Sequence, residues 1–184
     1  MRNQIIYDKE RAAELLAQKK IVAIFQGESE WGPRALGNRS ILFDPRVPNA
    51  KDIINEVKRR EWFRPFAGTI LLEHVHDYFE MLTLKESPYM TYAVKCKPKA
   101  KEIIPGVIHV DDTCRIQTVT REQNKHFYEL IECFYKITGV PVLFNTSFNL
   151  AKETMVEILE DAISTMQRSN IDFLYLPNKE MVDL

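Results

Sequence analysis

The sequence predicts a single α/β domain that spans residues 1–184. Short apolar runs of strand type alternate with amphipathic stretches of helical period, and no repeat, low-complexity tract or shift in composition divides them. Hydrophobic residues make up 45% of the chain and charged residues 28%, which is the composition of an ordinary globular protein. At this length the chain can bury one proper core.

The first half of the chain is expected to contain two helices and four strands. Asp8 can cap a helix that runs to about Lys20, because its carboxylate can accept from backbone N–H groups of the first turn. Apolar runs and helical spacing predict the others: strands at 21–25, 40–43, 66–73 and 89–95, and a helix at 52–60.

The clearest element of the second half is a helix at 122–138. Its apolar residues recur at helical spacing, and Gly139 is placed to stop it. Similar patterns predict strands at 107–110, 115–119, 140–144 and 171–176, and a last helix at 154–168.

Charge and cysteine content narrow the class of protein. The chain has 25 basic and 26 acidic residues, so it lacks the basic surplus of a typical nucleic-acid-binding module. No apolar stretch approaches the roughly 20 residues that a membrane helix needs, and the N-terminus has no signal-peptide pattern. The three cysteines form neither a C-x-x-C motif nor a disulfide framework. These features predict a cytoplasmic protein that binds neither membranes nor nucleic acid.

Several basic residues stand beside glycine, proline or small polar residues. Arg34 lies in a short rigid context, Lys58 and Arg60 end a predicted helix, and Arg64 follows at a strand entrance. Guanidinium groups match phosphate and carboxylate oxygens two at a time. Since the net charge is only -1, we expect a cationic pocket that arises from the placement of these residues.

Arg115 lies among apolar, strand-like residues, where an unpaired charge is costly. It therefore needs a partner. Asp111 or Asp112 can provide one, and so can a bound anion, and the sequence leaves both possibilities open.

Polar side chains follow the predicted strand at 140–144. Asn145, Ser147 and Asn149 stand where α/β folds commonly place ligand donors, at the carboxyl end of a strand. Ser147 can also cap a helix and Asn149 can turn the chain, but no nearby base marks Ser147 as a nucleophile. We therefore prefer a role as donors to a phosphate.

The sequence gives less support to other kinds of ligand-binding site. The sequence contains neither the P-loop nor the dinucleotide-binding glycine pattern. His74 and His76 are separated by one residue, but no second pair of ligands accompanies them, so no metal site is predicted.

Four blocks of the sequence resemble the C-terminal domain of O-carbamoyltransferases, a family that includes nodulation-factor and antibiotic-tailoring enzymes. The blocks occur in the family's order between about Leu15 and Leu176, and they are Gly32–Ser40, Arg64–Ala67, Arg115–Val119 and Asn145–Asn149. That domain is YrdC-like and related to threonylcarbamoyladenylate synthases. Their K-x-R…S-x-N signature is matched here by Lys58, Arg60, Ser147 and Asn149.

The resemblance implies a twisted mixed sheet flanked by helices, which binds ATP with Mg²⁺ and carbamoyl phosphate and forms carbamoyl adenylate. It implies catalytic roles for Lys58, Arg64 and Arg115, which hold phosphates and the carbamoyl group together with Arg34. It implies binding roles for Arg34, Arg60, Asn145, Ser147 and Asn149, with Ser147 and Asn149 donating to the adenylate phosphate and Asn145 shaping the loop.

Family members also carry an N-terminal domain of actin-like ATPase fold, which transfers the carbamoyl group to a hydroxyl acceptor. A chain of 184 residues has no room for it, so we expect the half-reaction here and a separate acceptor-transfer domain or subunit. The alternatives are a nucleotide- or RNA-binding module without turnover and an accessory subunit of a transferase. The near-neutral charge disfavours RNA.

Overall fold

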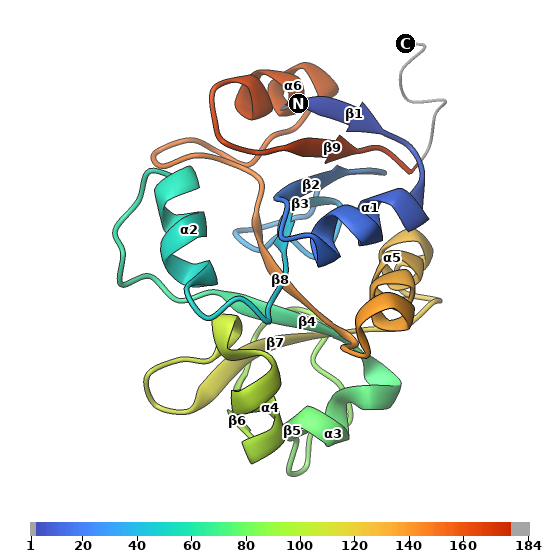
Figure 1. Cartoon of the computed structure of the whole chain (residues 1–184), viewed down its shortest axis with the longest axis vertical. Helices are drawn as coiled ribbons and strands as arrows, with labels where there is room; N and C mark the ends of the chain where they lie inside the picture. The colour runs from blue at the N-terminus through green and yellow to red at the C-terminus, as the bar shows by residue number, and fades with distance from the viewer. Residues whose placement is uncertain (1–2, 178–184) are drawn as a thin grey trace.

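A computed structural model describes residues 3–177 and confirms the predicted α/β class (Figure 1). Within these residues the strands form one nine-stranded mixed sheet in the order β1-β9-β2-β3-β8-β4-β7-β6-β5. The pairs β1/β9, β9/β2 and β4/β7 are parallel, and the others are antiparallel. The strands are β1 Gln4–Ile6, β2 Val22–Phe25, β3 Arg39–Phe43, β4 Ala67–Leu71, β5 Phe79–Glu80, β6 Ala93–Cys96, β7 Thr113–Val119, β8 Val142–Ser147 and β9 Phe173–Tyr175.

Helices lie on both sides of this sheet, with α1 and α5 together on one side and α2 on the other (Figure 1). The α-helices are α1 Lys9–Ala17, α2 Ala50–Val57, α3 Val75–Tyr78, α4 Pro98–Ile103, α5 Lys125–Thr138 and α6 Leu159–Gln167. Two 3-10 turns accompany them, η1 at Leu72–His74 and η2 at Pro105–Val107. None of the helices within residues 3–177 is both long and apolar enough to cross a bilayer.

The expected helix ends at Asp8 and Gly139 are confirmed. Asp8 Oδ1 accepts a 2.6 Å hydrogen bond from the backbone N–H of Arg11, which satisfies a donor of the first turn of α1. Gly139 ends α5 in the left-handed conformation, with φ of 72°, which glycine adopts without steric cost.

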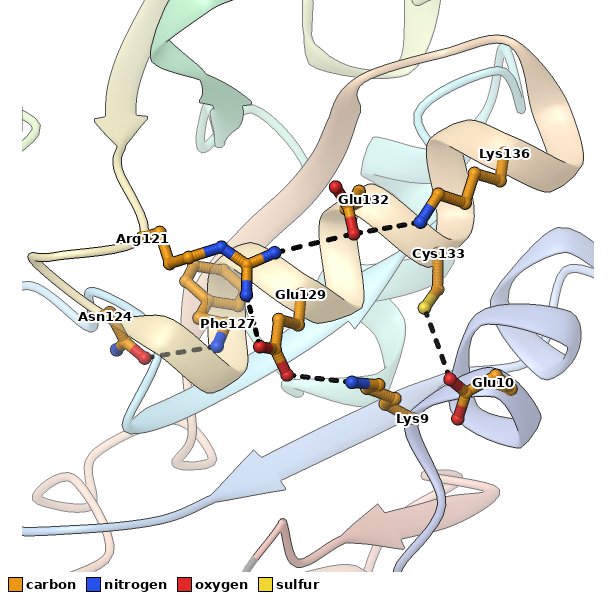
Figure 2. A network of polar contacts seen from close by, with 9 residues as sticks. All are labelled: Lys9, Glu10, Arg121, Asn124, Phe127, Glu129, Glu132, Cys133 and Lys136. Carbon is orange, nitrogen blue, oxygen red and sulfur yellow. Dashed lines mark hydrogen bonds and ion pairs between the residues drawn. The ribbon is translucent and has the colours of Figure 1, made fainter.

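An ion-pair network joins α1 to α5 (Figure 2). Lys9 Nζ donates to Glu129 Oε2 at 2.8 Å, and Arg121 binds the other oxygen of the same carboxylate. Glu132 pairs with Arg121 and with Lys136. The hydrogen bond from Lys9 lowers the pKa of the Glu129 carboxyl. The network therefore fixes the first helix against a helix that follows more than 100 residues later.

Several predicted elements differ in the structure. The strand expected at 89–95 begins only at Ala93, and the helix expected to reach about Lys20 ends at Ala17. The strand expected at 107–110 is wrong, because Pro105 starts η2 and the chain packs tightly there: a Cβ on Gly106 would lie 2.6 Å from the carbonyl oxygen of Val47. The helix expected at 154–168 begins only at Leu159. The segment from Asn145 to Ser147 belongs to β8, because it continues the pairing with β3.

Candidate functional site

The register of three central strands brings distant site residues together. Ala67 at the start of β4 pairs with Arg115 on β7 and with Asn145 on β8. Residues paired across a sheet share a face, and alternation along β8 puts Ser147 on that face too. Arg115, Asn145 and Ser147 are thus neighbours at one end of these strands.

All eight residues that the sequence predicted for the site line one pocket of about 550 Å³, hereafter the cationic pocket. They are Arg34, Lys58, Arg60, Arg64, Arg115, Asn145, Ser147 and Asn149. Arg59 and Lys152 add further positive charge to the lining, and Glu61 is the one carboxylate among the described lining residues. Such a lining favours a ligand with several negative charges.

Two arginines of the cationic pocket carry charge that no described residue balances. Within residues 3–177, neither the Arg34 nor the Arg115 guanidinium forms an ion pair or a hydrogen bond. Burial lowers the pKa of the Arg115 guanidinium, and the neighbouring Arg34 lowers it further. Two uncompensated cations side by side repel each other, and a bound anion removes that repulsion.

The two aspartates near Arg115 are engaged elsewhere. Asp111 Oδ1 accepts from the Thr113 hydroxyl at 2.7 Å, and Asp112 forms a 2.6 Å ion pair with Lys101. Of the partners that the sequence left open for Arg115, the structure removes both carboxylates.

Lys58 follows α2 directly and is buried, with only 2% of its surface exposed. Its Nζ donates to both the carbonyl and hydroxyl oxygens of Ser147, and to the carbonyl and side-chain oxygens of Asn149 at 2.9 and 2.8 Å. Burial, with a smaller effect of Arg60, lowers the pKa of Lys58 to about 7. The ammonium group thus holds the end of β8 and the loop after it in place.

Asn55, which was not predicted as a site residue, orients Arg60. Its Nε donates to Asn55 Oδ1 at 2.7 Å, and its guanidinium lies 4.2 Å from the centre of the Phe66 ring. Its Nη2 is buried and has no hydrogen-bond partner within the part of the chain that the structure describes. Burial, then the charge of Arg64, lowers the pKa of Arg60 to about 10.

Asn55 also anchors the segment that carries Arg64. Its Nδ2 donates to the carbonyl oxygens of Trp62 and Arg64 at 3.0 and 3.3 Å. Arg64 itself is exposed at the rim, where it pairs with Glu61 at 2.9 Å. The signal for Asn55 in the sequence is a polar residue between Ile54 and Val57, on the face that α2 buries.

Beneath the cationic pocket, a buried polar network reaches the loop that carries Arg34. Asn145 Nδ2 donates to the carbonyl oxygen of Ala35 at 3.3 Å, and Gln117 Nε2 donates to that of Leu36 at 2.8 Å. Thr69 Oγ1 donates to Gln117 Oε1 at 2.9 Å and accepts from Asn145 Nδ2 at 3.0 Å. Three neighbouring strands therefore fix two consecutive carbonyl groups of this loop.

The same loop is held from its other side. Glu30 Oε1 accepts from the backbone N–H groups of Leu36 and Asn38, both at 2.7 Å. Gly37 has φ of 112°, and a Cβ there would lie 2.2 Å from the Phe127 ring. The glycine is therefore required both by its backbone conformation and by its close approach to α5.

The donor set suits an anion better than a directly bound metal ion. Within residues 3–177, no three His, Cys, Asp or Glu side chains are grouped so as to hold a metal. The carboxylate that lines the pocket, Glu61, is already paired with Arg64.

Among its described residues the pocket has no hydroxyl or thiol activated as a nucleophile, and the Lys58 amine, whose pKa is lowered, is engaged by Ser147 and Asn149. Ser147 Oγ donates to Asn149 Oδ1 at 2.8 Å, and no histidine or carboxylate accepts its proton. Cys96 and Cys114 are buried, and burial raises the pKa of both thiols, that of Cys96 to about 12. The arrangement is suited to binding and orienting anions rather than to covalent catalysis.

Known proteins were compared with this chain. The family model described as Carbamoyltransferase C-terminus matches residues 13–182. Nodulation protein NolNO of Sinorhizobium fredii (strain NGR234) is 45% identical over 89% of this chain and 24% of its own length. Nodulation protein NolO of Bradyrhizobium diazoefficiens is 42% identical over 89% of this chain and 30% of its own length. The chain thus spans less than a third of either relative.

Solved structures support the fold. Full-length HypF, crystallised in a phosphate- and nucleotide-bound form, superposes with a TM-score of 0.65 at 20% identity, over 91% of this chain and 21% of HypF. P. abyssi Sua5, in complex with L-threonine, superposes with a TM-score of 0.64 at 15% identity, over 94% of this chain and 49% of Sua5. These likenesses confirm the expected YrdC-like fold. Because the family model covers nearly the whole chain, this protein belongs to the carbamoyltransferase C-terminus family.

Proposed function

We propose that the cationic pocket binds ATP and carbamoyl phosphate and forms carbamoyl adenylate, the first half of an O-carbamoyl transfer. Family membership supports the reaction class. The observation that carries the proposal is the pair Arg34 and Arg115, which face the pocket without an ion-pair partner among residues 3–177. Their charge matches a ligand that brings several phosphates.

The formation of carbamoyl adenylate from carbamoyl phosphate and ATP takes two steps. Water cleaves carbamoyl phosphate to carbamate and inorganic phosphate. A carbamate oxygen then bonds to the α-phosphorus of ATP while the bond to the β-phosphate oxygen breaks, which releases pyrophosphate. In the second step two anions must approach each other, and fixed cations lower that repulsion without a protein nucleophile.

The described residues have different roles in this reaction. Arg115 and Arg34 bind phosphate oxygens on one wall, and Lys58 with Arg60 supplies positive charge from the end of α2. Ser147 Oγ donates to the α-phosphate once it releases Asn149 Oδ1, and Asn149 donates through the second N–H of Nδ2, whose first N–H is bonded to the Glu153 carbonyl oxygen at 2.8 Å. Arg64, exposed at the rim, closes on the leaving pyrophosphate. Mg²⁺ bound to the triphosphate would neutralise part of its charge.

The transfer of the carbamoyl group to an acceptor is assigned to another domain or subunit. Within residues 3–177 no histidine or carboxylate accepts the Ser147 proton, the Lys58 amine is engaged by Ser147 and Asn149, and the chain spans less than a third of either matched relative. The carbamoyl adenylate would then be handed to that partner.

Pyrophosphate release from ATP and Mg²⁺ tests the proposal. Wild type and Arg115→Ala are assayed with and without carbamoyl phosphate. Release that requires carbamoyl phosphate, is matched by equal inorganic phosphate, and disappears in the variant supports it. If wild type binds ATP by calorimetry but releases nothing, the half-reaction by this chain alone is wrong. If it neither binds ATP nor releases pyrophosphate, the enzyme assignment falls.

A further inference from the structure

Asn145 lines the cationic pocket and carries a hydrogen-bond acceptor that has no partner among the described residues. The side chain is 1% exposed, lines the cationic pocket, and its Oδ1 has no hydrogen-bond partner within residues 3–177. A buried carbonyl oxygen without a partner is costly, and few are found in native proteins. A ligand that brings an N–H group would remove this cost.

The orientation of the Asn145 amide follows from the network around it. The carbonyl oxygen of Leu36 can only accept, so Gln117 must turn its Nε2 toward it at 2.8 Å. Gln117 Oε1 then faces the opposite way, where it accepts from Thr69 Oγ1 at 2.9 Å. The single hydroxyl proton of Thr69 is thereby used.

The hydrogen bonds of Asn145 itself fix which way its amide points. Asn145 Nδ2 lies 3.0 Å from Thr69 Oγ1, 3.1 Å from Gln117 Oε1 and 3.3 Å from the carbonyl oxygen of Ala35. All three neighbours need a donor, so turning the amide around would set Oδ1 against three acceptors. The oxygen left for the ligand is therefore Oδ1.

We infer that Asn145 Oδ1 selects the amino group of the carbamoyl substrate. This inference rests on the proposed function and adds a specificity residue to it. Asn145 pairs with Ala67, which in turn pairs with Arg115, so the acceptor lies in the same cross-strand row as an unpaired guanidinium. A carbamate offers an anionic oxygen and an N–H donor on the same carbon atom, and carbamoyl phosphate offers the N–H donor with anionic phosphate oxygens nearby, which matches this row. An acyl group that carries a methyl in place of the amino group leaves Oδ1 unpaired.

Binding of carbamoyl phosphate and acetyl phosphate, which differ by NH₂ against CH₃, tests the inference. Calorimetry on wild type should show a preference of about tenfold or more for carbamoyl phosphate. Asn145→Leu, of similar volume, should reduce this preference to about twofold or less while ATP still binds. Thr69→Val is the matched control: it removes a neighbour of Asn145 but leaves Oδ1 in place, and it should keep the preference.

The results that would contradict the inference can be told apart from one another and from a failure of the proposed function. Equal affinity of wild type for the two acyl phosphates overturns the inference without any variant. So does a preference that survives in Asn145→Leu, or one that falls equally in Thr69→Val, which would make the effect structural. A selective loss of ATP against inosine triphosphate in Asn145→Leu would place the adenine amino group at Oδ1 and overturn it as well. Failure of wild type to bind either acyl phosphate while it binds ATP would reject the proposed function itself.

Discussion

The Nζ atom of Lys58 lies 2.8 Å from Asn149 Oδ1 and 2.9 Å from the Asn149 carbonyl oxygen. One buried ammonium group thereby ties the end of α2 to the loop after β8. The backbone bond from the Ala151 N–H to the Lys58 carbonyl oxygen, at 2.8 Å, strengthens the same junction. The wall of the cationic pocket is consequently rigid on this side before any ligand binds.

The depressed pKa of Lys58 predicts a pH-dependent stability. Its pKa is about 7 in the folded protein against its usual 10.5, so above pH 7 the unfolded chain binds the additional proton. The free energy of unfolding should therefore rise with pH above 7, with a contribution of at most about 1.4 kcal/mol per pH unit. Lys58→Met should lack this contribution.

Urea unfolding measures the effect from pH 7 up to about 8, below the pKa of about 8.5 at which the cysteine thiols of the unfolded chain titrate. The quantity of interest is the difference between wild type and Lys58→Met, in which other groups cancel. Lys136→Met, at an exposed site, is the control and should parallel wild type. Parallel profiles for wild type and Lys58→Met would show that Lys58 stays charged throughout.

Arg115→Ala should separate binding from stability. The guanidinium is partly buried beside Arg34 and has no partner among residues 3–177, so its removal should leave the free energy of unfolding unchanged or raise it. ATP affinity should fall about tenfold or more, because a charge-assisted hydrogen bond contributes about 1.5–3 kcal/mol. Thermal unfolding and calorimetry on one preparation measure both.

Arg121→Ala is a suitable comparison for that variant. Arg121 pairs with Glu129 and Glu132 on α5 and does not line the pocket, so its loss should weaken the α1–α5 network and spare ATP binding. A destabilised Arg115→Ala with unchanged ATP affinity would contradict the assignment of Arg115 to an anion site.

Gly32 and Gly37, which flank Arg34 in the loop between β2 and β3, predict a graded pair of variants. Gly37→Ala sets a Cβ 2.2 Å from the Phe127 ring on a backbone with φ of 112°, and should cost about 3 kcal/mol or more. Gly32→Ala also has positive φ, 99°, but meets nothing within 4 Å, and should cost about 1–2 kcal/mol. Chemical denaturation ranks them, and equal costs would mean that the contact with Phe127 relaxes freely.

Asn55 variants test how Arg60 is positioned. Asn55→Leu removes the acceptor for Arg60 and the donor to two loop carbonyls, so ATP affinity should fall about tenfold, with a loss of about 1–3 kcal/mol in stability. Asn55→Asp keeps an acceptor for Arg60 and should retain more of the ATP affinity. If calorimetry gives both variants the same ATP affinity, the loop carbonyls and not Arg60 govern binding.

Local patterns in the sequence were sufficient for the central elements and for the cations. Apolar runs predict β2, β3, β4, β7 and β8 because these strands are buried, and helical spacing with Gly139 predicts α5. The eight residues chosen for the site line one pocket, although their catalytic and binding roles stay predictions.

What the sequence could not show depends on pairing between distant segments. β1 and β5 are too short to have a pattern of their own and exist because β9 and β6 pair with them. The continuation of β8 to Ser147 depends on β3, since Asn145 and Thr146 otherwise look like loop residues. Asn55 was not predicted as a site residue. Its partners are Arg60 and the loop carbonyl groups, and only the fold brings them close to it.

The insertion of β9 between β1 and β2 has a consequence for the order of assembly. β9, at Phe173–Tyr175, pairs in parallel with Gln4–Ile6 on one side and with Val22–Ile24 on the other. During synthesis these early segments leave the ribosome long before their shared partner does. Until β9 is synthesised, the apolar strand Val22–Phe25 has one edge without a pairing partner. An unpaired strand edge of this kind is prone to pair with a strand of another nascent chain. The sheet can therefore be completed only after β9 has been synthesised, and chaperones that shield unpaired strand edges would act on this protein during that interval.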